Sequence, residues 1–189
     1  MTALDRQANL LGALALVIAD QTAQTVATAA GQSVSAAAAL SALHHFLDRP
    51  TLDQLRKVLG LTPSGAVRLV DRLTDAGLVT RGAGDDGRSR SVALTGDGRR
   101  MAERITAARA ELLTDALDGL SLAERQTLHA LMGRVIANIV HSKDGGAWIC
   151  RLCDLDACGR AAGQCPTANA AAAKGTHGRI ASRRTTADS

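Results

Sequence analysis

Four cysteines, the only ones in a chain of 189 residues, lie close together near its C-terminus. They are Cys150, Cys153, Cys158 and Cys165, spaced C-x2-C-x4-C-x6-C, and a proline follows the last of them. Structural cysteines that are scattered through a core do not gather in this way, so the spacing indicates metal or redox chemistry. We therefore predict a four-cysteine metal-binding segment over residues 145–166.

Three kinds of thiol chemistry suit this spacing. Structural zinc sites usually carry two C-x2-C pairs separated by a longer spacer, and only Cys150 and Cys153 form such a pair here. An iron–sulfur cluster accepts short, uneven loops, and a final Cys-Pro is common in ferredoxin-type binding runs. Thiols this close together can also pair as disulfides under an oxidant. The pattern favours an iron–sulfur cluster, with zinc as the alternative, and the spacing leaves all three open.

A thiol oxidoreductase or electron-transfer protein that uses Cys150 and Cys153 is a competing class of function. Such an enzyme needs a strand–helix–strand environment around its C-x2-C pair, and the surrounding sequence does not predict one. No nucleophile-elbow pattern is present either. We therefore predict that the protein is not an enzyme. Aromatic residues make up 1% of the chain, which argues against a stacking platform for single-stranded nucleic acid.

The rest of the chain is predicted to be mainly helical with one small hairpin. Residues 60–63 form a glycine-containing turn between two short helices, in which Thr62 caps the second helix and Pro63 suits its first turn. Two short helices joined in this way are typical of a helix-turn-helix. We expect helices at residues 4–27, 33–47, 52–59, 63–76, 96–117 and 121–141, and strands at residues 78–80 and 91–94.

The helix at residues 63–76 has the residue pattern of a DNA-reading element. One face is apolar and must pack inward, and it consists of Ala66, Leu69, Val70 and Leu73. Ser64 and Gly65 lie at its N-terminal end, where a recognition helix normally meets base edges. Arg68 lies one turn further along and can form two hydrogen bonds with guanine. The opposite face carries Ser64, Arg68, Asp71, Arg72 and Asp75.

A charged glycine-rich turn follows this helix between the two predicted strands. Asp86-Gly87-Arg88-Ser89-Arg90 places two arginines just past a glycine, and Asp86 can orient Arg88 through an ion pair. Guanidinium groups on such a projecting hairpin fit the narrow, electronegative minor groove of A/T-rich DNA. A helix-turn-helix followed directly by this hairpin is a much more specific signal than either part alone.

Residues from about 33 to 140 resemble the MarR family of winged-helix regulators. The resemblance rests on residues 61–67 (LTPSGAV), on residues 69–73 (LVDRL) with 77–79 (GLV), and on residues 86–95 (DGRSRSVALT). It implies a mainly α fold with a small β-wing, in which a winged helix-turn-helix is joined to a helical dimerisation region. It also implies a homodimer that binds a pseudo-palindromic site on double-stranded DNA and regulates transcription, as a repressor in our interpretation.

The recognition-helix and wing roles of the family fall on named residues of this chain. The predicted DNA-binding set is Thr62, Ser64, Gly65, Ala66, Val67, Arg68, Arg72, Asp86, Arg88 and Arg90. Many family members also bind a small aromatic effector between the dimer helices and the winged domain. His44, His45 and Phe46 lie near where such a pocket would form, but the chain offers almost no other aromatic side chains to line it. A regulator that senses a small molecule and carries a structural zinc is the alternative within this class.

The predicted organisation has five parts. Residues 1–32 form an N-terminal dimerisation helix, 33–98 the winged helix-turn-helix domain, 99–144 the C-terminal dimerisation helices, 145–166 the cysteine segment, and 167–189 a disordered tail. The apolar run at residues 10–19 is too short to cross a bilayer, so we interpret it as a buried helix face in a cytoplasmic protein. A net charge of +4 permits DNA binding without arguing for it.

The position of the cysteines suggests how they could act. They follow the last predicted dimer helix, so gaining or losing a metal group there could shift that helix and change the spacing of the two recognition helices. Loss of a cluster on oxidation would then alter the affinity for DNA. This redox-dependent regulation of DNA binding is our hypothesis for the cysteine segment.

Overall fold

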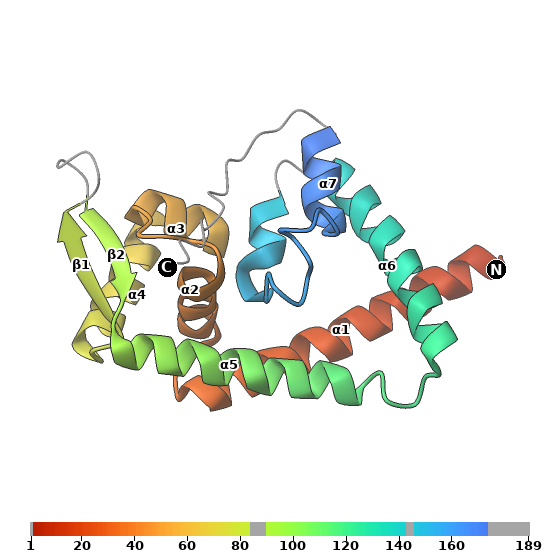
Figure 1. The fold of residues 1–189 in the computed structure, drawn as a ribbon, viewed down its shortest axis with the longest axis horizontal. Helices are drawn as coiled ribbons and strands as arrows, with labels where there is room; N and C mark the ends of the chain where they lie inside the picture. Colours follow the sequence, from red (N-terminus) through yellow and green to blue (C-terminus); the bar gives the residue numbers. More distant parts are fainter. Residues whose placement is uncertain (1, 84–89, 143–145, 174–189) are drawn as a thin grey trace, which may run out of the picture.

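The computed structural model describes residues 2–83, 90–142 and 146–173, which form a mainly helical molecule with one small sheet (Figure 1). The fold class predicted from the sequence is confirmed. In chain order the elements are α1 (Ala3–Ala30), α2 (Val34–His45), α3 (Leu52–Leu59), α4 (Pro63–Asp75), β1 (Val79–Ala83), β2 (Arg90–Leu94), α5 (Gly96–Asp115), α6 (Leu122–Ser142), the 3-10 helix η1 (Gly146–Leu152) and α7 (Pro166–Ala173).

Local capping signals set the boundaries of the helices that matter most here. Thr51 caps α3, and Thr62 caps α4 with its hydroxyl oxygen, which accepts a hydrogen bond from Gly65 N at 3.1 Å. Gly60 ends α3 with φ of 67°, a left-handed conformation that favours glycine. The turn between α3 and α4 therefore forms as the sequence predicts, because each of its residues satisfies a backbone requirement of one of the two helices.

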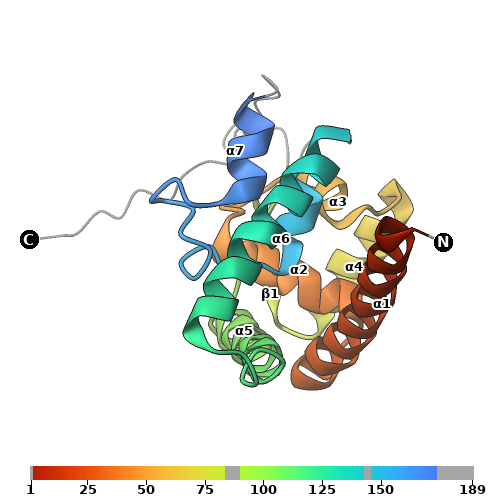
Figure 2. The ribbon, with the colours of Figure 1, turned by 90° about the vertical axis from the view of Figure 1, so that its right-hand side faces the viewer.

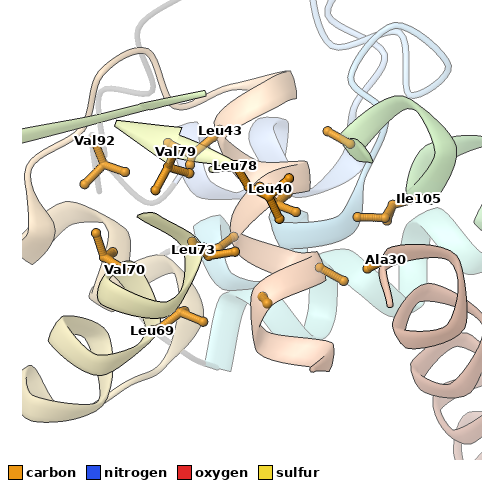
Figure 3. Close-up of a cluster of buried hydrophobic side chains, with 14 of the residues drawn as sticks. Ala30, Leu40, Leu43, Leu69, Val70, Leu73, Leu78, Val79, Val92 and Ile105 are labelled. Atoms are coloured by element: carbon orange, nitrogen blue, oxygen red, sulfur yellow. The ribbon is translucent and has the colours of Figure 1, made fainter. Parts of the chain in front are cut away.

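One hydrophobic core holds the winged domain together (Figure 3). Leu40 on α2, Leu69 on α4, Val79 on β1 and Ile105 on α5 are each no more than 1% exposed and belong to this core. The alanine-rich sequence of α2 lets the surrounding helices approach closely, because Ala37 and Ala39 are fully buried. The same core therefore fixes the positions of both α4 and the hairpin.

The wing is an antiparallel pair of strands with a third, very short pairing. Val79 in β1 pairs with Leu94 in β2, and the register runs on to Ala83 opposite Arg90. An isolated bridge joins Thr51 to Ser91, so the segment before α3 lines the outer edge of β2. The sequence prediction missed this pairing, because a single bridged residue gives no strand pattern. Residues 84–89, the predicted wing tip, lie outside the described residues.

The base of the wing is tied closely to the start of α5. The Thr95 hydroxyl donates to Gly77 O at 2.7 Å, and Thr95 N donates to Leu78 O at 3.1 Å. Gly98 lies so near this point that a Cβ atom at its position would be 1.9 Å from Leu78 O. Only glycine fits such a contact between α5 and the residue that precedes β1, so the wing is held in a fixed position relative to α5.

Much of α1 and α6 is uncovered within the protomer. Helix α6 and the N-terminal part of α1 lie at the end of the molecule away from the wing (Figures 1 and 2). Large apolar side chains are exposed on α1 at Leu4, Leu10, Leu11, Leu14, Leu16, Val17 and Ile18, and on α6 at Leu122, Leu131, Met132, Val135 and Ile139. Residues 10–19, which the sequence predicts to be a buried helix face, are therefore exposed in the protomer by itself.

The length of α1 also changes the membrane argument. The apolar run continues into a helix of 28 residues, whose most apolar window has a mean hydropathy of 1.4 and is 11% buried. By length and composition alone this helix could cross a membrane, so the short run of ten residues does not exclude it. A helix that is apolar along one side meets the same test when another protein surface covers it.

The C-terminal region contains more structure than the sequence suggests. Residues 166–173 form α7, which packs against α6, and not the beginning of a disordered tail. The prediction failed because an alanine-rich stretch of low complexity is equally compatible with a short helix when Pro166 stands at its first turn. Residues 174–189 of the predicted tail lie outside the described residues.

Candidate nucleic-acid interface and metal site

Helix α4 turns one face into the core and the other to solvent. Ala66, Leu69, Val70 and Leu73 are each at most 1% exposed, which confirms the predicted inward face. Ser64 and Arg68 lie on the exposed face near the N-terminal end of the helix, and Val67 is 41% exposed beside them. A continuous exposed surface of this kind on the second helix of a helix-turn-helix can enter a major groove.

One residue of the predicted DNA-binding set is in the wrong place. Ala66 is 1% exposed and lies in the core, so it cannot reach a base. Its position in the family motif placed it among the reading residues, whereas the helical period places it with Leu69 and Val70. Thr62 and Gly65 form the capping hydrogen bond at the start of α4, so they shape the end of the helix that would face DNA.

Two of the remaining predicted contacts, Arg90 and Arg72, lie on different surfaces. Arg90 is exposed at the start of β2, at the end of the paired strands farthest from α5. Arg72 is exposed on α4, but it lies beside the turn between α1 and α2 and lines a shallow pocket with Thr28 and Ser33. Asp86 and Arg88 lie outside the described residues. The proposed ion pair between them therefore stays a prediction.

Two arginines near the wing were not found by sequence reasoning. Arg81 on β1 forms an ion pair with Asp71 on α4, and this pair joins the recognition helix to the wing. Arg49 has a positive φ of 43°, which is unusual for a residue other than glycine, and its guanidinium lies next to Gly82. Neither position carries a local sequence signal, because the residues meet only when the hairpin folds back against the loop before α3.

The cysteine segment, which the structure describes from residue 146, packs directly on the winged domain. Cys150 is buried in a small apolar cluster with Ala42 and Phe46 of the α2 region and Val58 of α3, and Cys153 and Leu155 pack against the same cluster. Cys165 is 2% exposed, and its sulfur accepts a hydrogen bond from Ala168 N at 3.5 Å in the first turn of α7. The segment therefore reaches from α2 and α3 on one side to α7 on the other.

Comparison with known proteins identifies the winged domain. A family model described as the MarR family matches residues 30–89. A probable transcriptional regulator from Pseudomonas aeruginosa is 30% identical over an alignment that covers 66% of this chain and 96% of the other, with a TM-score of 0.52. The chain belongs to the MarR family. It is accordingly a DNA-binding transcriptional regulator and not an enzyme.

Solved MarR-type structures of lower identity share the fold. MepR, a regulator of the multidrug efflux pump MepA of Staphylococcus aureus, is 18% identical, covers 74% of this chain and 99% of its own, and has a TM-score of 0.62. A MepR variant bound to an oligodeoxyribonucleotide is 18% identical, covers 70% of this chain and 97% of its own, and has a TM-score of 0.53. The family model ends at residue 89, so the cysteine segment lies outside the region it matches.

The residues next to a possible effector pocket have other neighbours in this MarR-family protein. Phe46 is 4% exposed and packs with Cys150, and His45 hydrogen-bonds through Nε2 with the Thr106 hydroxyl at 2.9 Å. Asp154 of the cysteine segment lies 3.9 Å from His45 Nδ1. The surface around His45 and Phe46 is thus covered, at least in part, by the cysteine segment.

The four thiols interact as two pairs. The neighbouring Cys153 thiol, together with burial, raises the pKa of Cys150. Burial and the neighbouring Cys165 thiol raise the pKa of Cys158 to about 12. The interaction with Cys150 and the nearby arginines lower the pKa of Cys153 to about 6 despite its burial. Each pair therefore holds one proton more tightly than a free thiol would.

The arrangement only partly meets the needs of a metal. Among the described residues, no three His, Cys, Asp or Glu side chains form a group that could hold a metal ion as it stands. A zinc ion bonded to four sulfurs at about 2.3 Å brings them within about 3.8 Å of one another, so zinc would have to draw the two pairs together.

Arginines near the cysteines provide positive charge that would stabilise an anionic metal group. Arg109 on α5, Arg160 and Arg151 all act on Cys153, and Arg160 Nη1 lies 3.8 Å from Cys150 Sγ. The Nε atom of Arg109 is buried without a hydrogen-bond partner. A group that carries four thiolates has a net negative charge, and it would offer this buried donor an acceptor. The four cysteines remain the predicted ligands.

Alkylation of the metal-free protein tests the thiol pairs. The lowered pKa of Cys153 makes it a thiolate above about pH 6, whereas Cys150 and Cys158 stay protonated. We expect iodoacetamide to modify Cys153 first, with a rate that rises through pH 6 and levels off by pH 8. Peptide mass spectrometry after short pulses measures this. Equal labelling of Cys150 and Cys153 at pH 7 would show that the pair does not exist.

Proposed function

We propose that this regulator is a homodimeric repressor that binds a pseudo-palindromic operator and responds to the state of its cysteine segment. Ser64, Val67 and Arg68 of α4 enter a major groove, while Arg88 and Arg90 of the wing reach the neighbouring minor groove. The exposed, ordered N-terminal end of α4 is the observation that carries this proposal. Two-fold symmetry places the half-sites about 34–36 Å apart, one turn of the duplex.

The uncovered helices support the homodimer. Exposure of an apolar surface of this extent on α1 and α6 to water is unfavourable. A second copy of the chain can cover this surface with the same two helices. This assignment also accounts for the apolar length of α1 without a membrane, and a regulator that binds chromosomal DNA acts in the cytoplasm. Sedimentation in detergent-free buffer tests it, because a dimer is expected and large aggregates or detergent dependence would favour the membrane.

Replacing Arg68 by alanine is expected to relax the base preference at one position in each half-site. The guanidinium can bind guanine through two hydrogen bonds, which contribute about 1–3 kcal/mol of discrimination. Binding to operators with single base changes, measured by fluorescence anisotropy, quantifies the loss. Arg125→Ala, an exposed arginine on α6, is the matched control and should leave the preference unchanged. An Arg68→Ala protein with wild-type base preference would remove Arg68 from the reading surface.

Replacing Arg88 by alanine is expected to weaken binding to all duplexes by a similar factor. A wing arginine in the minor groove contributes charge, and its loss reduces the slope of log affinity against log salt by about one per protomer. Titrations at several salt concentrations, on specific and unrelated duplexes, measure the slope. A loss that is confined to one base position, with an unchanged slope, would contradict the role given to the wing.

The response is proposed to come from a metal group held by Cys150, Cys153, Cys158 and Cys165, with an iron–sulfur cluster favoured over zinc. The pairing of the thiols, the surrounding arginines and the buried Nε of Arg109 support such a group. Metal analysis and the visible spectrum of anaerobically purified protein test it. Iron with inorganic sulfide and absorbance near 400 nm is expected, colourless protein with zinc would replace the cluster by zinc, and metal-free protein would end the proposal.

A further inference from the structure

The cysteine segment lies between two parts of the protomer that have little other contact. Figure 1 shows it, in light blue, between α2 and α3 on one side and α6 with α7 on the other. On the first side, Cys150, Cys153 and Leu155 pack against Ala42, Phe46 and Val58. These last residues belong to the layer of the winged domain that lies behind α4, because α3 packs on α4.

The other half of the segment is fixed to the C-terminal helices. Cys165 immediately precedes α7, and its sulfur accepts the backbone hydrogen bond from Ala168 N that caps this helix. Helix α7 packs along α6, where Pro166 lies beside Gly133 closely enough that a Cβ atom there would be 3.7 Å away. The first cysteine pair thus belongs to the winged domain by its contacts, and Cys165 belongs to the C-terminal helices.

Helix α5 also reaches the cysteines. Arg109 extends from α5 toward the cysteines, since its charge acts on Cys153 while its Nε atom is buried without a partner. His45, at the end of α2, connects Asp154 of the cysteine segment to Thr106 of α5. Because the Thr106 hydroxyl donates to Ala102 O, its oxygen accepts the hydrogen bond from His45 Nε2. Helices α2, α5 and α7 therefore converge on the four thiols.

We propose that the metal group is a joint that binds the winged domain to α6 and α7 within each protomer, with Cys150 and Cys153 as its ligands on one side and Cys158 and Cys165 on the other. This deepens the proposed function and rests on it for the presence of the group. In this proposal the metal group acts on DNA binding through the face of α2 and α3 that carries Phe46 and Val58, behind the recognition helix α4.

The joint sets the direction of the response. Without the group, the described contacts that hold the segment to the winged domain are the small apolar cluster, Leu152 against the main core, and the contact between His45 and Asp154. The winged domain then moves more freely relative to α6. Binding of both recognition helices to DNA restricts this movement, and the lost conformational entropy weakens the affinity for DNA. The loaded form, whose spacing is already restricted, binds the operator more tightly than the stripped form.

Hydrogen–deuterium exchange of the wild-type protein tests the joint without any substitution. In the loaded protein, amides of residues 42–47 and 52–59 are expected to exchange about tenfold more slowly than in the stripped protein. Amides of β1 serve as the internal reference, because they lie away from the segment. Protection that changes only in residues 150–173, with none in α2 and α3, would overturn the proposal.

A substitution on the docking surface separates this joint from the metal site itself. Leu155→Ser weakens the packing against the cluster of Ala42, Phe46, Val58 and Cys150 and replaces no predicted ligand, and Asp156→Ser is the control at an exposed neighbour. Wild type and Asp156→Ser are expected to differ about tenfold in operator affinity between loaded and stripped forms, and Leu155→Ser to differ by less than about twofold at unchanged metal content.

The possible failures point to different claims. A Leu155→Ser protein that keeps its metal and responds as fully as wild type would overturn the joint and leave the responsive regulator standing. A wild-type protein whose affinity is the same in both forms would overturn the responsive part of the proposed function, and the exchange measurement would still decide whether the group fixes α2 and α3. If Leu155→Ser loses its metal, the exchange data on wild type decide.

Discussion

The Cys150→Ser, Cys165→Ser double variant is expected to fold normally and to lose its metal group. Serine keeps a hydrogen-bonding oxygen at both places: it caps helices better than most residues, so Ala168 N retains an acceptor, and Arg160 can donate to it at position 150. A neutral hydroxyl is a poor substitute for a thiolate ligand. With one ligand lost from each pair, affinity for the metal should fall by more than about 100-fold.

Metal content and folding are measured on the same samples. Elemental analysis and the visible spectrum report the group, while far-ultraviolet circular dichroism and thermal unfolding report the fold. Asp156→Ser, at an exposed position between the cysteines, is the control and should keep a full complement of metal. A double variant that holds as much metal as wild type would mean that the four cysteines are not the ligands, whatever the spacing suggests.

Gly98→Ala is expected to lower the free energy of unfolding by about 2–3 kcal/mol and to weaken operator binding. The new methyl group would lie 1.9 Å from Leu78 O, which is a backbone atom and cannot rotate away. Leu78 O also accepts the hydrogen bond from Thr95 N, so moving the strand breaks the connection between the wing and α5. The stability lost through this steric clash exceeds the gain in helix propensity, about 1 kcal/mol, that alanine brings within a helix.

Chemical denaturation of Gly98→Ala and Gly96→Ala measures this effect against a matched change. Gly96 lies in the same turn, and its nearest neighbour is the flexible end of Arg100 at 3.6 Å from the added Cβ atom. Gly96→Ala should therefore change the free energy of unfolding by less than about 0.5 kcal/mol. Equal stabilities of the two variants would show that the close approach of α5 to the wing is not present in solution.

The winged domain could be predicted from the sequence because each of its parts is specified locally. Thr51 and Thr62 cap their helices, Gly60 ends one of them, and the period of Leu69, Val70 and Leu73 selects the buried face. A fold can be predicted from its sequence when helix caps, turns and hydrophobic period all indicate the same structure. Ala66 shows the limit of a motif, since the same residue belongs to a family signature and to the core.

The surroundings of the cysteines could not be predicted, because they arise from contacts between distant parts of the chain. Nothing near Arg109 indicates that it lies beside Cys153, and Phe46 was considered for an effector pocket, not for a contact with Cys150. The exposed face of α1 has the same origin. Its apolar residues read as a buried helix, and burial within the protomer and burial by a second copy leave the same pattern in the sequence.

Selection from a pool of random duplexes tests the DNA-reading surface most directly. The purified protein is mixed with the pool, and bound duplexes are recovered, amplified and sequenced over several rounds. We expect one pseudo-palindromic sequence to be enriched, with half-sites about one helical turn apart, and Arg68→Ala to lose the preference at one base of each half. Recovery of unselected duplexes, or enrichment that is identical for Arg68→Ala, would contradict reading by α4.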